Sequence, residues 1–386
     1  MENKRQNIEL ADIFNRYGGD FLKEHHLCSV QSKAFEAIVS CRTAALSYHA
    51  NECDSCGHVK YSYNSCRNRH CPKCQFVKQA QWVDKLKANL PPTRYFHVVF
   101  TIPQCLHKTF YINQADSYAL LFKAAAEALK NCAANPKFLG AQTGAVAVLH
   151  TWGQTLTYHP HIHMIVPAGG LSDDDMEWVP SQKKFLLPVK VLSALFRGIL
   201  CKYLQKAVTK NQISLADDLD SFDELKKQIY LKNWNVYCKK PFATPERVIE
   251  YLGKYTHRVA ISNHRIMADD NGRITFRYKD SQTGIFNKLI TLDATEFIMR
   301  FLMHILPCGF YKIRYFGILA QSNAQSKAAL CFDLLETQTF LGVLEGLPAI
   351  DVWRMISGND PLCCPVCKKG KMIPMTALSE KKKQPG

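Results

Sequence analysis

The chain has 386 residues, 47% of them hydrophobic, and its 49 Lys and Arg against 33 Asp and Glu give a formal net charge of +16. This length supports two or three domains with cores of their own, and no apolar run is long enough to predict a membrane-spanning helix. The basic balance favours a polyanionic partner, most often nucleic acid, although an unrelated basic enzyme could carry the same charge.

The first residues and the cysteines indicate the compartment. The polar start Met1–Arg5 leads into a helix-like segment without the apolar core of a secretory leader. We therefore expect a cytoplasmic protein without a membrane anchor. In that compartment the 16 cysteines indicate metal binding more often than disulfides.

The first part of the chain predicts helices followed by a zinc ribbon. Residues 7–47 carry apolar side chains at helical spacing, and Gly18-Gly19 is expected to interrupt this run. Two Cys-x-x-Cys pairs then follow at a separation of about one short hairpin, which is typical of a structural zinc site. The simplest set of zinc ligands is Cys53, Cys56, Cys71 and Cys74, with Cys66, His58 and His70 as spare donors.

Basic side chains surround this ribbon, namely Arg67, Arg69 and Lys73. They indicate either a surface that contacts DNA or the solvated face of a fold stabilised by zinc, and we favour contact with DNA. A helix at 79–90 and a boundary at Pro91-Pro92 follow. The next stretch, 94–102, is rich in β-branched and aromatic residues and predicts a central strand.

Two histidines on a later strand form the candidate catalytic centre. Strands at 144–153 and 158–166 are expected to pair as an antiparallel hairpin. Residues two apart on a strand share a face, so His161 and His163 point the same way and can together hold a divalent metal. The alternative is a pair of half-buried histidines on a sheet, which is the better explanation for one histidine but not for two at this spacing.

Other histidines of this region have different expected roles. His150 lies on the neighbouring strand and is the expected third ligand, with Gln154 and His97 as alternatives. For His97, within the strand at 94–102, a buried and hydrogen-bonded side chain is the simpler interpretation. His159 shares the face of the metal pair, but it precedes a proline at the strand entrance and is expected to lie outside the site.

A second chemical element is the stretch 245–258, in which Pro245 suits the first turn of a helix. Tyr251 and Tyr255 are four residues apart, so their hydroxyls project on one face of that helix. Tyrosines at helical spacing are more commonly core aromatics. The intervening Gly253-Lys254, the following His257-Arg258 and the histidine strand together favour a catalytic interpretation.

The remaining segments carry weaker signals. Helices are expected at 116–133, 188–232, 295–306 and 323–342, and strands at 259–262, 274–278 and 289–291. The stretch 306–317 interleaves aromatic and basic residues, including Lys312 and Arg314, and can contact nucleic acid or form a strand whose charged ends reach solvent. Cys364 and Cys367 form an isolated Cys-x-x-Cys pair without an obvious partner.

These elements support one kind of chemistry. A metal held by His161 and His163 can polarise a scissile phosphate. A tyrosine oxygen can attack in line, leaving a 5′-phosphotyrosine link and a free 3′-OH. The link conserves the phosphodiester energy, so strands can be rejoined without a nucleotide cofactor. Two tyrosines allow two strands to be held, or two cleavages in sequence.

The sequence resembles HUH-type single-strand DNA endonucleases, and within them the rolling-circle transposases of the IS91 insertion-sequence family. Four stretches carry the resemblance: Asn64–Gln75, His97–Pro103, Leu149–Gly170 and Tyr251–Asn263. The resemblance implies that His161 and His163 are the paired metal ligands and that Tyr251 and Tyr255 occupy the nucleophile positions. A departure is Cys308, where the family pattern has lysine, so a phosphate contact could be lost there.

The expected fold class is α+β, with a helical and zinc-ribbon module, then an HUH endonuclease domain with a central antiparallel sheet flanked by helices, then a mixed C-terminal region. The expected domains are residues 1–90, 91–320 and 321–386, the last with a helix, the Cys-x-x-Cys pair and a basic tail. The candidate DNA-contact residues are Arg67, Arg69, Lys73, Lys254, Arg258, Lys312 and Arg314.

The expected function is that of a bacterial, cytoplasmic DNA transposase that cleaves and rejoins single strands at element ends and target DNA. The expected cofactors are Mg²⁺ or Mn²⁺ at the catalytic site and Zn²⁺ in the ribbon, with no nucleotide cofactor, and the oligomeric state stays open. Two alternatives remain: a rolling-circle replication initiator or relaxase of a plasmid or phage, and a non-catalytic zinc-ribbon DNA-binding regulator. The regulator leaves the histidine strand and the tyrosine pair unexplained.

Overall fold

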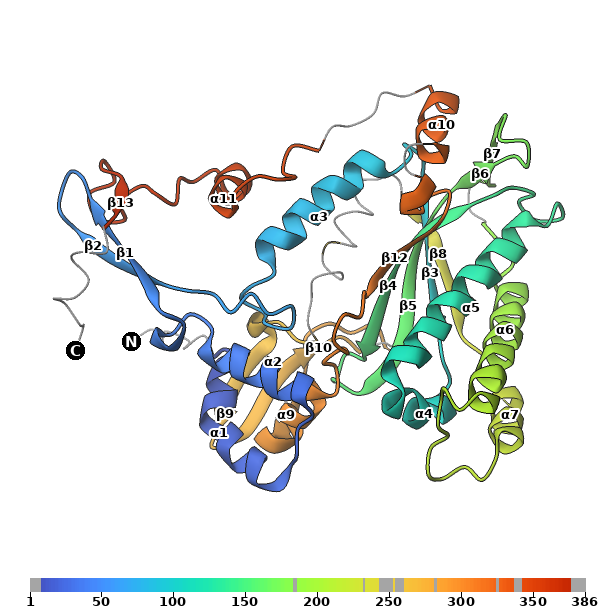
Figure 1. Ribbon diagram of the computed structural model, residues 1–386, viewed down its shortest axis with the longest axis horizontal. Coiled ribbons are helices and arrows are strands. Elements are labelled where there is room, and N and C mark those ends of the chain that lie inside the picture. Colours follow the sequence, from blue (N-terminus) through green and yellow to red (C-terminus); the bar gives the residue numbers. More distant parts are fainter. Residues whose placement is uncertain are drawn as a thin grey trace. The chain divides into compact units, whose positions relative to one another are not determined.

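The computed structural model describes residues 8–182, 186–231, 233–242, 253, 260–280, 283–323, 326–336 and 342–375 (Figure 1). The chain forms two compact units. The first consists of Met1–Trp82, His257–Ile305 and Leu344–Gly386, and the second of Val83–Thr256 and Leu306–Val343. The sequence predicted three consecutive domains. The structure differs because segments from the middle and the end of the chain pack with the N-terminal helices and hairpin.

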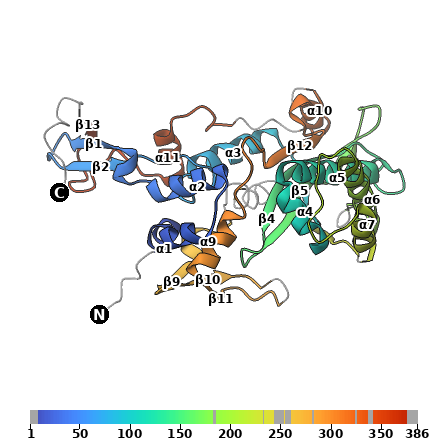
Figure 2. The same cartoon turned by 60° about the horizontal axis from the view of Figure 1, so that its bottom comes forward.

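The first unit contains a layer of helices on a small sheet. Its helices are α1 (Leu10–Glu24), α2 (Ser29–Ser40) and α9 (Ala294–Leu302), and its antiparallel strands are β9 (Ile266–Asp270), β10 (Arg273–Tyr278) and β11 (Lys288–Asp293). Helix α9 packs on this sheet and α1 packs on α9 (Figure 2). Phe14 lies between two other rings, with centroids 4.9 Å from Phe35 and 5.5 Å from Phe301, and these aromatics form the core.

The expected break at Gly18-Gly19 is wrong, because α1 continues through both glycines to Glu24. The reason lies in packing against α2. A Cβ at Gly18 would lie 2.3 Å from Cζ of Phe35, whereas a Cβ at Gly19 would have nothing within 4 Å. Gly18 therefore allows the Phe35 ring to approach the helix backbone, and this contact outweighs the low intrinsic helix propensity of glycine.

A second sheet of the first unit joins the two ends of the chain. Strands β1 (Tyr48–Cys53) and β2 (Val59–Tyr63) form an antiparallel hairpin, and β13 (Met372–Pro374) pairs with β1 on its other side. Helix α11 (Ala349–Ser357) belongs to the same unit, and α3 (Phe76–Asn89) leads from the first unit into the second.

The second unit is built on a five-stranded sheet of order β12-β4-β5-β3-β8, in which all neighbours are antiparallel. The strands are β3 (Tyr95–Thr101), β4 (Gly144–Trp152), β5 (Tyr158–Pro167), β8 (Val236–Phe242) and β12 (Ile313–Gly317). The predicted hairpin and the predicted central strand are confirmed, and together with the helices they confirm the expected α+β class with an antiparallel sheet. A short ribbon of β6 (Gly169–Leu171) and β7 (Trp178–Pro180) follows β5.

Helices cover one face of this sheet (Figure 1). They are α4 (His107–Ile112), α5 (Gln114–Ala134) and α6 (Val189–Thr209). Helix α7 (Phe222–Leu231) packs against α6, and α10 (Lys327–Leu334) lies later in the chain. Phe100 on β3 meets Phe196 on α6 with ring centroids 5.0 Å apart, and Ile162 on β5 is the cross-strand partner of Phe100. Since side chains alternate along a strand, the neighbours His161 and His163 point to the opposite face.

Several other predictions can be compared with the described residues. The helical stretch expected at 188–232 divides into α6 and α7, and the described part of the strand expected at 259–262 is not a strand. The stretch 306–317 contains edge strand β12, which pairs with β4. The expected tyrosine helix, with Tyr251, Lys254, Tyr255 and Arg258, lies outside the described residues. Among the described helices, none combines the length and apolar character needed to cross a bilayer.

Candidate functional site

Three histidines of β4 and β5 lie together on the sheet face opposite α5 and α6. His150 is the cross-strand partner of His161, and His163 follows two residues later on the same strand. One ring nitrogen from each of the three lies within 4.8 Å of those of the other two. The structure thus brings His150 to the predicted pair, whereas the alternative third ligand Gln154 is an exposed residue of the connecting turn.

Hydrogen bonds fix the orientation of two of these rings. Nδ1 of His161 donates to the backbone carbonyl of His159 at 2.6 Å. Nδ1 of His163 lies 2.7 Å from Nε2 of His97 on β3. In both rings Nε2 then lies on the opposite edge, which is the arrangement of metal-binding histidines whose second nitrogen is held by a hydrogen bond. The expectation that His97 is buried and hydrogen-bonded is confirmed.

Burial keeps these rings neutral. Desolvation lowers the pKa of His161 to about 4, although the hydrogen bond to the His159 carbonyl acts in the opposite direction. Desolvation also lowers the pKa of His163 well below its usual range, assisted by the charges of neighbouring histidines. Desolvation also lowers the pKa of His97 to about 3. The neutral imidazole is the form that binds metal. The geometry of the three-histidine cluster and the lowered pKa values of His161 and His163 therefore fit a divalent ion.

A lysine that the sequence did not single out lies on the same face. Lys239 of β8 is the cross-strand partner of His97, and it is exposed. Its positive charge contributes to lowering the pKa of His97 and of His163. The only signal in the sequence was the β-rich stretch 236–242, but its position beside β3 depends on the order of strands in the sheet, which local pattern does not give.

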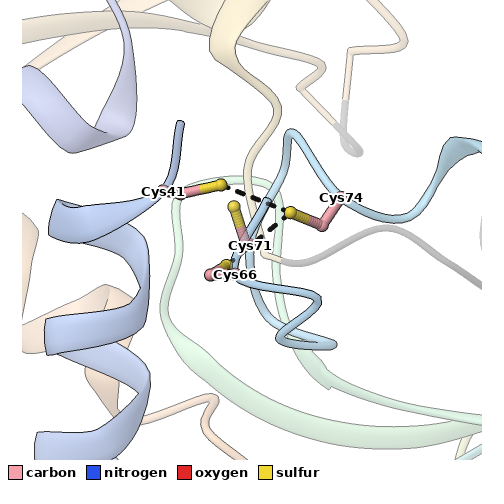
Figure 3. A group of neighbouring side chains, drawn as sticks. All are labelled: Cys41, Cys66, Cys71 and Cys74. Carbon is pink, nitrogen blue, oxygen red and sulfur yellow. Dashed lines mark hydrogen bonds between the residues drawn. The ribbon is translucent and has the colours of Figure 1, made fainter. Parts of the chain in front are cut away.

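Four cysteines form a separate cluster near the end of α2 (Figure 3). They are Cys41, Cys66, Cys71 and Cys74. Sγ of Cys74 lies 3.3 Å from Sγ of Cys41 and 3.6 Å from Sγ of Cys66. Zinc–sulfur bonds of about 2.3 Å in a tetrahedron place the sulfurs roughly 3.8 Å apart, so the cluster has the dimensions of a four-thiolate zinc site.

The predicted set of Cys53, Cys56, Cys71 and Cys74 is not brought together. The hairpin separates these residues, because Cys53 ends β1 at the turn whereas Cys66 follows β2 at the base of the hairpin. A strand as long as β1 spans roughly 17 Å. At the base, the backbone N–H of Arg42 donates to the carbonyl of Asn64 at 3.0 Å, which places Cys41 beside Cys66. Cys53 and Cys56 instead lie with Cys364 and Cys367.

The described candidates for DNA contact differ in their surroundings. Arg67 is exposed beside the Cys41 cluster, Arg69 and Lys312 are half-buried, and Lys73 forms an ion pair with Glu9. The guanidinium of Arg314 lies 4.6 Å from the ring centroid of Phe122 and 5.3 Å from that of Phe310. The charged end of Arg314 therefore packs on aromatic rings, whereas the alternative expectation of a simple strand had such charged ends reach solvent.

Comparisons with known proteins agree with this architecture. Residues 13–102 match the family described as "Transposase zinc-binding domain", and residues 144–327 match the family described as "Putative transposase". The first match contains the Cys41 cluster, and the second contains the histidine cluster. The N-terminal region is therefore a zinc-binding domain.

Two relatives match along nearly the whole chain. One is the "Putative transposase y4qJ" of Sinorhizobium fredii, which is 44% identical over 378 residues, covering 96% of this chain and 95% of that protein. The other is the transposase for insertion sequence element IS801 of Pseudomonas savastanoi pv. phaseolicola, which is 28% identical over 381 residues, covering 96% of this chain and 90% of that protein. The chain belongs to the IS91 family of insertion-sequence transposases.

Proposed function

We propose that this transposase cleaves and rejoins single-stranded DNA by the HUH-type, rolling-circle mechanism through 5′-phosphotyrosine intermediates. Its DNA partners are the single-stranded element ends and the target. The observation that carries the proposal is the cluster of His150, His161 and His163, whose nitrogens lie within 4.8 Å of one another on one sheet face. These three residues would hold Mg²⁺ or Mn²⁺, and Tyr251 and Tyr255 are the nucleophiles.

Different residues of the sheet have different roles at this site: some hold the metal, some orient its ligands and one adds positive charge. A divalent ion bound there would act as a Lewis acid on the scissile phosphate. His97 holds the ring of His163 through the 2.7 Å bond between their nitrogens. Lys239 adds positive charge on the same face, where a phosphate oxygen of the DNA can accept from its ammonium group. His159 holds His161 through its backbone carbonyl.

The tyrosines supply the covalent step. The phenol oxygen of one tyrosine attacks phosphorus, the bond from phosphorus to the 3′-oxygen breaks, and that oxygen takes up a proton to become a 3′-OH. A free phenol has a pKa near 10, so a cation such as Lys254 or the ion would favour loss of its proton. A 3′-OH can later attack the phosphotyrosine and rejoin strands, which is why no nucleotide cofactor is needed.

The zinc-binding domain has a structural role in this proposal. Cys41, Cys66, Cys71 and Cys74 bind one Zn²⁺. That ion would fix the loop that carries Arg67, Arg69 and Lys73, and this loop would contact DNA through its basic side chains. The ion pair between Lys73 and Glu9 ties the same loop to the residue that precedes α1.

The test is formation of a covalent adduct. The full chain is incubated with single-stranded element ends and Mn²⁺ or Mg²⁺, and protein–DNA species that survive denaturant are counted. Wild type should form the adduct only with metal, and His161→Ala and His163→Ala should each abolish it. His26→Ala, which changes an exposed histidine of the first unit, is the matched control and should react normally.

The outcomes separate the alternatives. Metal-independent adducts, or normal adducts in His163→Ala, would contradict the histidine site. Specific DNA binding without any adduct would favour the non-catalytic regulator. A replication initiator or relaxase would also form an adduct, but only a transposase should join element ends to a target strand in the same reaction.

A further inference from the structure

Four cysteines from the two ends of the chain meet beside the β1–β2 hairpin. Sγ of Cys53 lies 3.7 Å from Sγ of Cys367, and Sγ of Cys56 lies 3.7 Å from Sγ of Cys364. The members of the second pair are 308 residues apart in the sequence. All four sulfurs lie within 4.8 Å of one another, and the four thiols are free cysteines without a disulfide. These separations match the roughly 3.8 Å edge of a four-thiolate zinc tetrahedron.

The two Cys-x-x-Cys turns have the same backbone geometry. The N–H of Gly57 donates to the carbonyl of Cys53 at 3.0 Å, and the N–H of Lys368 donates to the carbonyl of Cys364 at 3.1 Å. Gly57 has φ of 69° and Lys368 has φ of 59°, both in the left-handed region. Lysine rarely adopts this conformation. Its presence indicates that the second turn is held in the same shape as the first, with both sulfurs of each turn directed to one point.

Strand pairing and hydrogen bonds hold the two turns next to each other. Strand β13 pairs with β1 so that Cys53 is opposite Met372, and the N–H of Lys371 donates to the Asp54 carboxylate at 2.8 Å. Gly370 donates its N–H to Sγ of Cys367 at 3.3 Å, a bond that favours the thiolate form. A Cβ on Gly370 would lie 2.4 Å from Sγ of Cys53, so this position admits only glycine.

We propose that Cys53, Cys56, Cys364 and Cys367 bind a second structural Zn²⁺, which fastens the C-terminal segment to the N-terminal hairpin. Zinc is the preferred ion because four thiolates in a tetrahedron select it over Mg²⁺ and Mn²⁺, whose ligands are oxygens. The site is separate from the Cys41 cluster and does not depend on the histidine site. Loss of this zinc would loosen β13 from β1, since the described ladder between the two strands is short, with three paired positions.

The experiment compares zinc content and thiol protection in the full chain. Zinc is measured by elemental analysis in wild type, in Cys364→Ser/Cys367→Ser and in Cys53→Ser/Cys56→Ser. Each double variant should lose one zinc per chain relative to wild type. In Cys364→Ser/Cys367→Ser, alkylation followed by mass spectrometry should find Cys53 and Cys56 newly reactive, while Cys66 and Cys74 stay protected. Cys363→Ser, which alters the exposed neighbour, should keep the wild-type zinc content.

A measurement on wild type keeps the test independent of how the variants fold. During slow removal of zinc by a chelator, the four thiols of the proposed site should become reactive together. Immediate alkylation of Cys364 and Cys367 in the zinc-loaded chain would overturn the proposal. It would also be overturned by an unchanged zinc content in Cys364→Ser/Cys367→Ser, or by a mass showing two disulfides in place of metal.

Discussion

Nε2 of His97 lies 2.7 Å from Nδ1 of His163, and the two rings are almost parallel, with planes 6° apart and centroids 5.0 Å apart. The two residues come from neighbouring strands, β3 and β5, and both are buried. A bond between buried polar groups is worth more than one in water, and losing one partner leaves the other unsatisfied. His97 is therefore in a position to orient His163 without binding metal itself.

The first prediction tests that role. His97→Ala should weaken Mn²⁺ binding by about 10- to 100-fold, because loss of a hydrogen-bonding partner to a ligating histidine has effects of this size. His97→Gln should recover part of the affinity, since its side-chain amide can hydrogen-bond to Nδ1 of His163. Mn²⁺ binding measured by electron paramagnetic resonance compares the variants. Equal affinity in His97→Ala and wild type would show that the bond does not support a metal ligand.

The second prediction concerns pH. Burial lowers the pKa of His161 to about 4, so this ring stays neutral in the folded protein well below the ordinary histidine value. Histidines with the ordinary pKa of about 6.5 would have roughly ten protonated rings for each neutral ring at pH 5.5, and metal binding would weaken steeply. We expect the dissociation constant for Mn²⁺ to change by less than about 3-fold between pH 7.5 and 5.5.

The lowered pKa of His161 preserves metal binding at low pH, but it makes the folded protein less stable there. A lowered pKa means that the unfolded chain takes up a proton below about pH 6.5 while the folded chain does not, so stability is lost as the pH falls from there towards 4. Circular dichroism at each pH must therefore accompany the Mn²⁺ measurement, which is interpreted only where the protein is folded. A tenfold weakening per pH unit in protein that stays folded would contradict the lowered pKa.

The histidine strand shows what local sequence predicts well. Alternating apolar residues and histidines gave the hairpin of β4 and β5, the shared face of His161 and His163, and the approach of His150. These relationships depend on the two-residue period of a strand and on a short connection. Lys239 could not be found in this way, because it joins the face through the pairing of β8 with β3, and these strands are far apart in the sequence.

The cysteines show more clearly what the sequence alone does not predict, namely which of them lie together in the folded chain. The Cys-x-x-Cys spacing drew attention to Cys53 and Cys364, but it did not tell which of these pairs meet. Cys41 had no spacing signal at all, and its place in a cluster follows from where α2 ends relative to the base of the hairpin. Pairing of Cys56 with Cys364 is a contact over 308 residues, which only the folded chain reveals.

The third prediction distinguishes the cysteine cluster that contains Cys41 from the set of zinc ligands expected from the sequence, which lacks it. Cys41→Ser should release one zinc and lower the unfolding temperature of the first unit by on the order of 10 °C, because structural zinc contributes folding free energy directly. Cys28→Ser, which changes an exposed cysteine at the other end of the same helix, should do neither. Zinc analysis and calorimetry measure both effects. Full zinc retention in Cys41→Ser would show that Cys41 is a buried core residue and not a zinc ligand.

The fourth prediction uses the adjacent glycines of α1. Gly18→Ala should lower the free energy of unfolding by about 1–3 kcal/mol, because the new methyl group overlaps the Phe35 ring in a packed core. Gly19→Ala should raise it by about 0.5–1 kcal/mol, since alanine favours a helix and the position is open. Urea unfolding of both variants gives the comparison. Equal effects of the two changes would contradict the close contact of Gly18 with Phe35.

The last prediction concerns the tyrosines, whose spacing of four residues is the motivating observation. Tyr251→Phe/Tyr255→Phe removes only two hydroxyls, so the protein should fold and bind single-stranded DNA with wild-type affinity, yet form no covalent adduct. Tyr230→Phe, at an exposed tyrosine of α7, should form the adduct normally. Adducts on a residue other than Tyr251 or Tyr255, mapped by mass spectrometry of the DNA-linked peptide, would refute the assignment of nucleophiles.

The single variants test whether two nucleophiles act in sequence. If one tyrosine makes the first cut and the other receives the second strand, one single variant should still form an adduct at the element end but should not complete joining to the target. The other should fail at the first cut. A helix places residues four apart on the same side, so either hydroxyl could reach the same metal-bound phosphate. Complete strand transfer by both single variants would therefore mean that one tyrosine suffices, and that the second hydroxyl is a substitute and not a partner in the reaction.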